Sequence, residues 1–360
     1  MQRNRNPKFI RLMRTGRYVQ LVPFSSLQAR RMPAPLASAL NRFLQIDRLE
    51  QLYRDARPGD SLCANLMREL EIEIQVTAED LARVPASGAV VAISNHPFGL
   101  LDGALLTSLL TRVRRDMRVL TNRLLSELPE MAKVGIFIDP FERPESRAAN
   151  ARALKEAIGH LKAGGMLLVF PAGEVAHFDF RSGAVRDPEW RTTAARLIRL
   201  TNARALPILV PGSNSLPFQV LGMVHPRLRT AALPAELLNK RGRRVEVRIG
   251  GVIESARVAA LSDEEATRYL RLRAEILARR EPGNGGDAAP AARTPVAAEG
   301  DRAELLREIE QLPADCLLGE TREMAVFFAG AGQIPRALRE IGRLREVTFR
   351  AAGEGSGLDR

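Results

Sequence analysis

The sequence VVAISNHPFGLLDG at residues 90–103 decides the fold of this chain. Its first four residues are apolar, which is typical of a buried strand, and the proline and two glycines that follow indicate a turn. The turn carries one histidine, His96, and one acidic residue, Asp102. A histidine at a strand end with an acid a few residues on is a candidate general base with its orienting group. The alternative is a loop histidine held by a local hydrogen bond.

Strands and helices alternate from residue 88 onward. We predict strands at 89–94, 117–121, 134–139, 166–170 and 205–210, an edge strand at 244–250, and helices at 102–115, 124–131, 146–163, 189–202 and 263–280. Ser146 is a candidate cap for the third of these helices. This order favours an α/β fold with a mainly parallel or mixed sheet flanked by helices.

The segments outside this alternation divide the chain into further parts. Helical patterns at 35–56 and 60–72 precede a strand at 72–76 and a helical turn at 78–84, with Asp60 or Ser61 as a cap. A Pro/Ala/Gly-rich stretch at 281–300 is typical of a disordered linker. We therefore predict a basic amphipathic region at 1–60, an α/β domain at 61–280, the linker, and a short helical tail at 301–360.

The composition points to an acidic partner or surface. The chain of 360 residues has a formal net charge of +12. Its first fifty residues hold ten Lys or Arg against two acidic residues, and large apolar side chains lie between the arginines. This mixture suits the surface of an anionic membrane. A disordered basic tail is the alternative.

The two cysteines, Cys63 and Cys316, lie far apart in the sequence. Their spacing predicts neither a metal site nor a disulfide framework, and a reducing cytosol is the default. No run of about eighteen apolar residues predicts a membrane-spanning helix.

Polar or turn-forming residues follow four of the predicted strands. These blocks are Asn95–Gly103, Gly135–Pro140, Phe170–Val175 and Leu206–Gly212. The carboxyl ends of parallel strands meet at one edge of an open α/β sheet, where ligands bind. We therefore expect all four blocks to face one cleft.

Together the blocks resemble the glycerolipid acyltransferase superfamily, over about residues 45–255. The motif Asn-His-Pro-x-Gly-x-x-Asp-Gly at 95–103 is similar to the branch called haemolysin-like or lyso-ornithine-lipid O-acyltransferase. The resemblance implies an O-acyltransferase in which His96 is the general base and Asp102 orients it. The substrate supplies the attacking oxygen, so no protein nucleophile is needed.

The resemblance also implies further substrate-binding residues. Asn95 and Gly99 belong to the first motif. Backbone N–H groups near Gly173 are expected to bind the acceptor or the thioester oxyanion. Glu174 is expected to bind a cationic or hydroxyl-bearing headgroup, with a purely structural loop carboxylate as the alternative.

Two departures from the commoner family pattern bear on the acceptor. Five residues separate His96 from Asp102 instead of four, as in the haemolysin-like branch. Members that acylate phosphate-bearing acceptors tend to carry arginines in the second and third blocks, where this chain has Pro140 and Glu174–Ala176. Arginine is the natural partner of a phosphate. These departures therefore favour a lyso-ornithine-type lipid over lysophosphatidate as the acceptor, unless Arg123, Lys133 and Arg143 replace the missing arginines.

The implied donor co-substrate is an acyl thioester, either acyl-carrier protein or acyl-CoA, with no bound cofactor and no metal. The expected partners are an anionic membrane surface, a lyso-lipid and acyl-carrier protein, with no nucleic acid. The expected location is peripheral, at the cytoplasmic face of the inner membrane. Residues 301–360 resemble the truncated start of an N-acyltransferase module, with a C-terminal helix that docks on the main domain as the alternative. The alternative function is a non-catalytic lipid- or nucleic-acid-binding protein on an acyltransferase-like fold.

The other histidines receive plainer interpretations. His160 is expected at the surface and His225 in a loop, while His177 is a minor rival to His96 as the base. Trp190 is expected to pack in the core.

Overall fold

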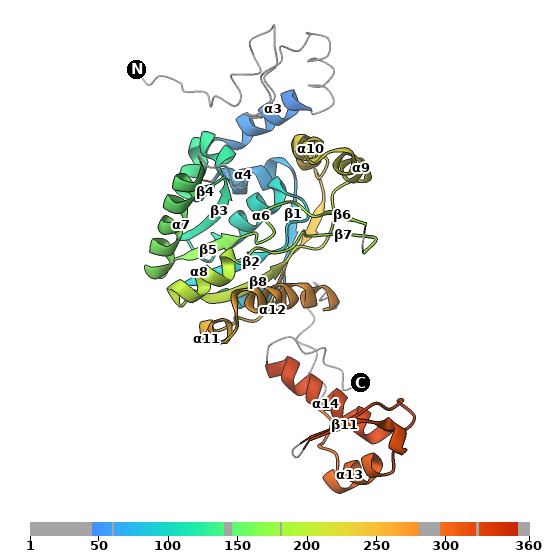
Figure 1. The fold of residues 1–360 in the computed structure, drawn as a ribbon. Coiled ribbons are helices and arrows are strands. Elements are labelled where there is room, and N and C mark those ends of the chain that lie inside the picture. Colours follow the sequence, from blue (N-terminus) through green and yellow to red (C-terminus); the bar gives the residue numbers. More distant parts are fainter. Residues whose placement is uncertain are drawn as a thin grey trace, which may run out of the picture. The chain divides into compact units, whose positions relative to one another are not determined.

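The protein is known from a computed structural model, which describes residues 45–59, 61–139, 146–180, 182–280, 296–321 and 324–351. The chain divides into a larger unit, residues 1–278, and a smaller unit, residues 279–360 (Figure 1). Most of the predicted membrane-associating region and of the predicted linker, namely residues 1–44 and 281–295, lies outside the described residues. Among the helices that are described, none has the length and apolar character needed to cross a bilayer.

A six-stranded sheet with the order β10-β8-β2-β5-β3-β4 forms the centre of the larger unit (Figure 1). The strands are β2 (Val90–Ser94), β3 (Met117–Asn122), β4 (Gly135–Ile138), β5 (Met166–Val169), β8 (Arg204–Leu209) and β10 (Arg248–Ile249). Their pairings are parallel except for that of β10 with β8. The predicted α/β fold with a mainly parallel sheet is confirmed.

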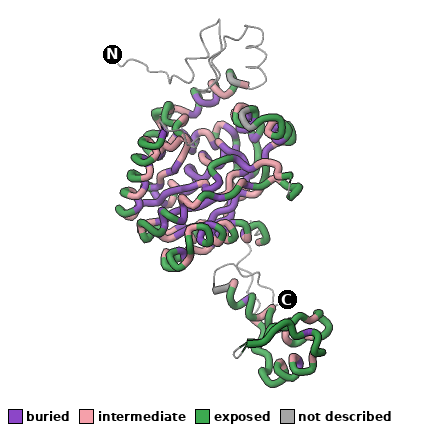
Figure 2. Tube along the Cα trace, in the orientation of Figure 1, coloured by how far each residue is buried: buried purple, intermediate pink, exposed green. Residues whose placement is uncertain are grey.

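Helices cover both faces of the sheet and bury its alternating side chains (Figure 2). Val90 and Ala92 of β2 point into one core, together with α3 (Ile46–Ala56), α4 (Leu62–Glu69) and α6 (Leu100–Leu110). Val91 and Ile93 point into the other core, which is completed by α7 (Arg147–Lys162), α8 (Thr193–Thr201) and α12 (Asp263–Glu275). Strands buried on both faces explain the continuous apolar runs in the sequence.

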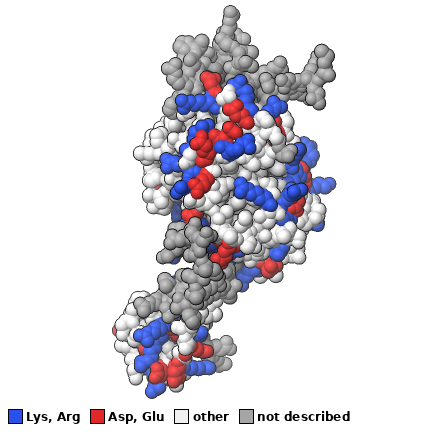
Figure 3. Space-filling view, turned by 180° about the vertical axis from the view of Figure 1, so that it is seen from behind, with Lys and Arg blue, Asp and Glu red and all other residues white. Residues whose placement is uncertain are grey.

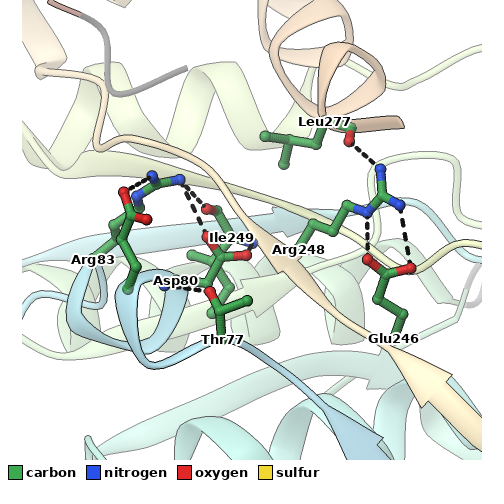
Figure 4. Close-up of polar contacts among 8 residues, drawn as sticks. Thr77, Asp80, Arg83, Glu246, Arg248, Ile249 and Leu277 are labelled. Atoms are coloured by element: carbon green, nitrogen blue, oxygen red, sulfur yellow. Dashed lines mark hydrogen bonds and ion pairs between the residues drawn. The ribbon is translucent and has the colours of Figure 1, made fainter. Parts of the chain in front are cut away.

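A polar network joins the edge strand β10 to the elements around it (Figure 4). Asp80 lies in the short helix α5 (Ala78–Ala82), and its carboxylate accepts the N–H of Ile249 at 3.0 Å and pairs with Arg83 at 3.2 Å. Arg248 donates to Glu246 and to the carbonyl of Leu277, beyond the end of α12. The network satisfies buried backbone groups at a sheet edge that would otherwise stay unpaired.

Several predicted elements differ in the structure. The predicted helix 124–131 forms two 3-10 turns, η1 (Arg123–Glu127) and η2 (Pro129–Lys133), because Pro129 breaks a continuous helix. Residues 244–250 split into β9 (Arg244–Glu246), which pairs with β1 (Glu73–Gln75), and β10. The cap at Ser61 is confirmed, since its hydroxyl accepts the N–H of Ala64. Ser146 occupies the predicted N-cap position of α7, but its hydroxyl makes no capping bond and donates to Asp139 instead.

Further elements were not predicted from the sequence. They are the hairpin of β6 (His177–Asp179) and β7 (Ala184–Arg186), the helices α9 (Leu216–Val224) and α10 (Pro226–Leu238) and the short helix α11 (Ser255–Ala259). The helix predicted at 263–280 is α12, which continues as the 3-10 turn η4 (Ile276–Arg279). Helix α9 packs against α10 and against β6. On the face of the molecule drawn in Figure 3, basic and acidic side chains lie interspersed over the larger unit, so the excess positive charge does not form one patch there.

The smaller unit has little buried surface. It consists of α13 (Arg302–Glu310), η5 (Ala314–Cys316), a hairpin of β11 (Leu317–Glu320) and β12 (Ala325–Phe327), and α14 (Pro335–Ala351). Every strand residue of its hairpin is exposed. The helical tail is present, but its predicted relation to an N-acyltransferase module stays a prediction.

Candidate functional site

The carboxyl ends of β2, β5 and β8 bring three of the four predicted blocks together. The side-chain amide of Asn95, just after β2, donates to the carbonyl of Val210 and accepts its N–H, both at 2.8 Å. The N–H of Ala176, in the loop after β5, donates to the carbonyl of His96 at 2.9 Å. The polar atoms of Asn95 are therefore used in joining two strand ends, which is a different task from the substrate binding expected of it.

The turn between β2 and α6 fixes the carboxylate of Asp102. Gly99 has a φ of 81°, which favours glycine, and a Cβ atom at this position would lie 2.7 Å from Leu233. Directly after Gly99 the helix begins, and Asp102 at its third position accepts the N–H groups of Phe98 and Gly99 at 2.8 and 2.9 Å, both on Oδ2. A carboxylate at a helix N-terminus is also favoured by the helix dipole. Asp102 is completely buried.

His96 lies against this carboxylate. Its Nδ1 atom is 3.0 Å from Oδ2 of Asp102, although the ring N–H is not aligned with that oxygen as a standard hydrogen bond requires. Such contacts in substrate-free enzymes often tighten only when the substrate binds. The ring stacks on Phe170 with centroids 4.2 Å apart, and 18% of its side chain stays exposed. The contact with Asp102 therefore directs Nδ1 toward a buried carboxylate.

A second carboxylate, Asp187, holds the backbone of His96. Its Oδ1 accepts the His96 N–H at 3.0 Å, and its Oδ2 accepts the indole N–H of Trp190 at 3.0 Å. Burial raises the pKa of Asp187 above its ordinary value, and the hydrogen bonds from His96 and Trp190 oppose that rise. Sequence reasoning missed this residue, because nothing near Asp187 indicates a partner 91 positions away. Trp190 packs in the core as predicted.

The loop after β5 carries the two expected binding residues of the third block. Gly173 has a φ of 69°, and its N–H donates to the carbonyl of Phe170 at 3.0 Å. That N–H serves the turn itself, so the expectation that it binds an oxyanion is not supported by its geometry. Glu174 pairs with the buried Arg229 of α10 at 2.8 Å, while about half of its side chain is exposed. Glu174 therefore anchors the loop to α10 and still faces solvent.

Of the three basic residues that could compensate for the absent arginines, the structure describes Arg123 and Lys133. Arg123 is exposed directly after β3, at the carboxyl edge of the sheet. Lys133 precedes β4, and the pairing of Val119 with Gly135 puts it at the amino edge, opposite to His96. Its expected role in substrate binding is therefore disfavoured by the register. Arg143 lies outside the described residues, as does Pro140.

The rival histidine is engaged elsewhere. His177 at the start of β6 has its Nδ1 atom 3.1 Å from the carbonyl of Val175. His160 is half-buried rather than fully exposed, and its Nε2 atom lies 3.0 Å from the carbonyl of Met166. Of His96, His160 and His177, it is His96 whose ring contacts a buried carboxylate.

Comparisons with known proteins agree with the predicted family. A family model described as Acyltransferase matches residues 45–280. The lyso-glycine lipid O-acyltransferase of Phocaeicola vulgatus is 25% identical over 187 residues, which cover 51% of this chain and 64% of that protein. The lyso-glycine lipid O-acyltransferase of Bacteroides thetaiotaomicron is 24% identical over 193 residues, which cover 52% of this chain and 67% of that protein. The chain therefore spans about two thirds of the length of these curated relatives.

A solved structure gives a weaker match. The 1-acyl-sn-glycerophosphate acyltransferase of Thermotoga maritima is 15% identical, with a TM-score of 0.38. The match covers 67% of this chain and 95% of the chain in that structure. A match at this level decides neither fold nor function.

Proposed function

The chain belongs to the acyltransferase family, as its resemblance to the glycerolipid acyltransferases predicted, and on that premise we propose that it transfers a fatty acyl group from an acyl thioester to a hydroxyl of a lyso-lipid. The single observation that carries the proposal is the contact between Nδ1 of His96 and Oδ2 of Asp102. In the proposed mechanism the carboxylate of Asp102 keeps the proton of the neutral ring on Nδ1, so that Nε2 can accept the proton of the hydroxyl. This is the pairing that a general base requires.

The reaction needs no nucleophile from the protein. Nε2 of His96 takes the proton of the acceptor hydroxyl while the oxygen attacks the thioester carbonyl carbon. The carbon–sulfur bond then breaks, and the departing thiolate receives the proton from the imidazolium. Asp102 stabilises the imidazolium between these two steps, as a buried carboxylate does in a catalytic triad. The products are the acylated lipid and the free thiol of the carrier.

We propose that the acceptor is a lyso-lipid with an amino-acid headgroup. The relatives from Phocaeicola vulgatus and Bacteroides thetaiotaomicron carry lyso-glycine lipid in their names, and glycine and ornithine are both amino acids. The absence of arginines from the second and third blocks weighs against a phosphate. Both acyl-carrier protein and acyl-CoA are candidate donors. The net charge of +12 favours approach of an acidic carrier protein.

The test is an acyl-transfer assay with labelled acyl-CoA or acyl-carrier protein and three acceptors: lyso-glycine lipid, lyso-ornithine lipid and lysophosphatidate. We expect turnover with an amino-acid lipid, and a loss of at least about a hundredfold in His96→Ala, the size typical of a lost general base. His177→Ala is the matched control and is expected to keep its activity. Faster turnover of lysophosphatidate would overturn the acceptor, and full activity of the His96 variant would overturn the base.

A further inference from the structure

The outer side of α9 carries an apolar stripe that no part of the described chain covers. Leu216, Val220, Met223 and Val224 follow the spacing i, i+4, i+7 and i+8, which puts them on one side of a helix. Their exposed fractions lie between 48 and 76%. We call these four residues the α9 stripe. Leu228, near the start of α10, and Phe180, at the tip of the β6–β7 hairpin, are exposed as well.

The opposite side of α9 is attached to the candidate site. Phe218 is buried and shares a small core with Val175, in the loop after β5, and with Ala232 of α10. Gln219 accepts the N–H of Phe178 at 3.0 Å and thereby ties α9 to the β6–β7 hairpin. The residue after Val175, Ala176, donates its N–H to the carbonyl of His96. The helix is therefore held rigidly on the loop that contacts the proposed base.

The chemistry of the stripe fits a lipid bilayer. The sequence contains no Lys, Arg, Asp or Glu between Arg204 and Arg227, so immersion of α9 requires no side-chain charge to leave water. A specific protein interface combines its apolar centre with hydrogen-bonding groups and aromatic or arginine anchors. The stripe is entirely aliphatic or thioether in character.

We propose that the α9 stripe, with Leu228 and Phe180, rests in the interface of an anionic membrane and brings the edge of the sheet that carries His96 to the lipid. The inference rests on the proposed function, because a lyso-lipid acceptor resides in the bilayer from which the enzyme must take it. The net charge of +12 is attracted to anionic headgroups, and the stripe adds apolar contact with the lipid chains below them. A helix lying in the interface differs from a spanning helix, which α9 with its nine residues is too short to be.

The first experiment measures the depth of α9 directly. An environment-sensitive dye is attached at Val220→Cys in the full chain, since both native cysteines are buried. Leu200→Cys, on α8, is the matched control, because Leu200 is an exposed leucine at 60%. With vesicles of phosphatidylethanolamine and phosphatidylglycerol, we expect a blue shift of the emission at position 220 and none at position 200. Equal responses at both positions would overturn the proposal.

The second experiment separates apolar from electrostatic binding. In the variant Leu216→Gln/Val220→Gln/Val224→Gln, we expect vesicle partitioning at about 1 M salt, where charges are screened within about 3 Å, to fall about tenfold or more. The control Leu200→Gln/Leu272→Gln removes comparably exposed leucines from α8 and α12 and should partition like wild type. Circular dichroism and thermal unfolding show that each variant is folded. Unchanged partitioning of the triple variant would overturn the proposal.

The third experiment distinguishes failure of the surface from failure of the proposed function. The triple variant should acylate a lyso-lipid dispersed in detergent micelles within about twofold of wild type, and should lose about tenfold on acceptor embedded in vesicles. If the dye shifts but wild type transfers no acyl group in either micelles or vesicles, the proposed function is overturned and the proposed membrane surface stands. Acyl transfer without a dye shift overturns the surface and keeps the function. A blue shift that needs no vesicles and grows with protein concentration identifies a second copy as the occupant, and also overturns the surface.

Discussion

At the scale of single residues, the backbone around Asp102 decides the position of His96. The carboxylate of Asp102 is fixed by two N–H groups from its own turn, and the N–H of His96 is fixed by Asp187. Gly99 makes the turn possible, because its φ of 81° and its close approach to Leu233 exclude a side chain. The proposed base is thus held from two sides by buried carboxylates.

The first prediction concerns the turn. In Gly99→Ala the added Cβ has both an unfavourable φ and contacts of 2.7 Å with Leu233 and 3.0 Å with Val175. We expect a loss of about 3–5 kcal/mol in the free energy of unfolding, measured with urea. The control Gly242→Ala has a φ of 69° with no atom within 4 Å, and should lose only about 1 kcal/mol. Equal losses in the two variants would mean that the close approach is unimportant.

The second prediction concerns the pH dependence of Asp187. Because burial raises its pKa above the ordinary 3.8, the folded chain holds this proton more tightly than the unfolded chain does. The contribution of Asp187 to the free energy of unfolding of wild type therefore falls as the pH rises from about 3.8 to the raised pKa. The asparagine in Asp187→Asn does not titrate. Its side chain has one acceptor oxygen, whereas the N–H of His96 and the indole N–H of Trp190 need two.

We expect Asp187→Asn to be less stable than wild type, by about 1–3 kcal/mol at the acidic end, with the difference shrinking as the pH rises. Urea unfolding of both proteins between pH 4 and pH 8 (about the range where the fold persists) measures this difference. A difference that is constant with pH would contradict the raised pKa. Glu189→Gln, two positions away, serves as the control and should track wild type throughout.

The sequence predicted the parts of the site that lie close together along the chain. His96 and Asp102 share one turn, so their spacing was sufficient to suggest their contact. Asp187 could not be found in the same way, because its contact with His96 depends on how the loop after β7 returns to the sheet. Lys133 was misplaced for a different reason. It directly precedes the strand predicted at 134–139, and a residue before a strand of a parallel sheet lies at the amino edge, opposite to His96.

At the scale of elements, short polar networks fasten the strands at the edge of the sheet. Asp80 in α5 binds both the N–H of Ile249 and the side chain of Arg83, so one buried carboxylate joins a helix to β10 (Figure 4). Arg83 also pairs with Glu79, whose side chain is mostly exposed. Asp80 and Glu79 therefore pair with the same arginine, but Asp80 is buried and Glu79 is mostly exposed.

The third prediction uses this difference. Asp80→Ala removes the buried acceptor of the Ile249 N–H and leaves Arg83 with one acid fewer, so we expect a loss of about 2–4 kcal/mol in stability. Glu79→Ala removes only an exposed pair and should cost about 0.5 kcal/mol or less. Chemical denaturation of both variants measures the contrast. Similar losses would show that the network contributes no more than a surface ion pair.

Elements with a strong apolar period were predicted well, and those without one were missed. Strands β2, β5 and β8 consist mostly of apolar residues, and their predicted bounds differ from the observed ones by a residue or so. Helix α9 escaped prediction because it is apolar on both sides, so that no contrast between faces marks its period. Pro217 near the start of α9 and Pro234 inside α10 also predict breaks in a helix.

At the scale of the whole molecule, the chain consists of two units with unequal cores. The larger unit contains the sheet, both of its covering layers and every described residue of the candidate site. The smaller unit exposes both strands of its hairpin and, on α14, Leu338, Ile341, Leu344 and Val347. Folding and acyl transfer are therefore expected to reside in the larger unit.

The fourth prediction follows from this division. A chain that ends at Arg280 keeps Leu277 and Ala278, whose carbonyls bind Arg248. We expect it to unfold with the same main transition as the full chain, within about 2 °C, and to retain acyl transfer within about twofold. Calorimetry and the acyl-transfer assay measure these two properties. A large loss of activity with an unchanged transition would assign a functional role to residues 281–360.

The double use of Asp102 has a consequence for the evolutionary history of such chains. Its carboxylate caps the start of α6 whether or not the molecule acylates anything. A lineage that abandoned catalysis would thus remain under selection to keep this aspartate, in order to fold, while the imidazole beside it became free to drift. Under the proposed mechanism, position 96 and not position 102 is therefore expected to separate active descendants from inactive ones.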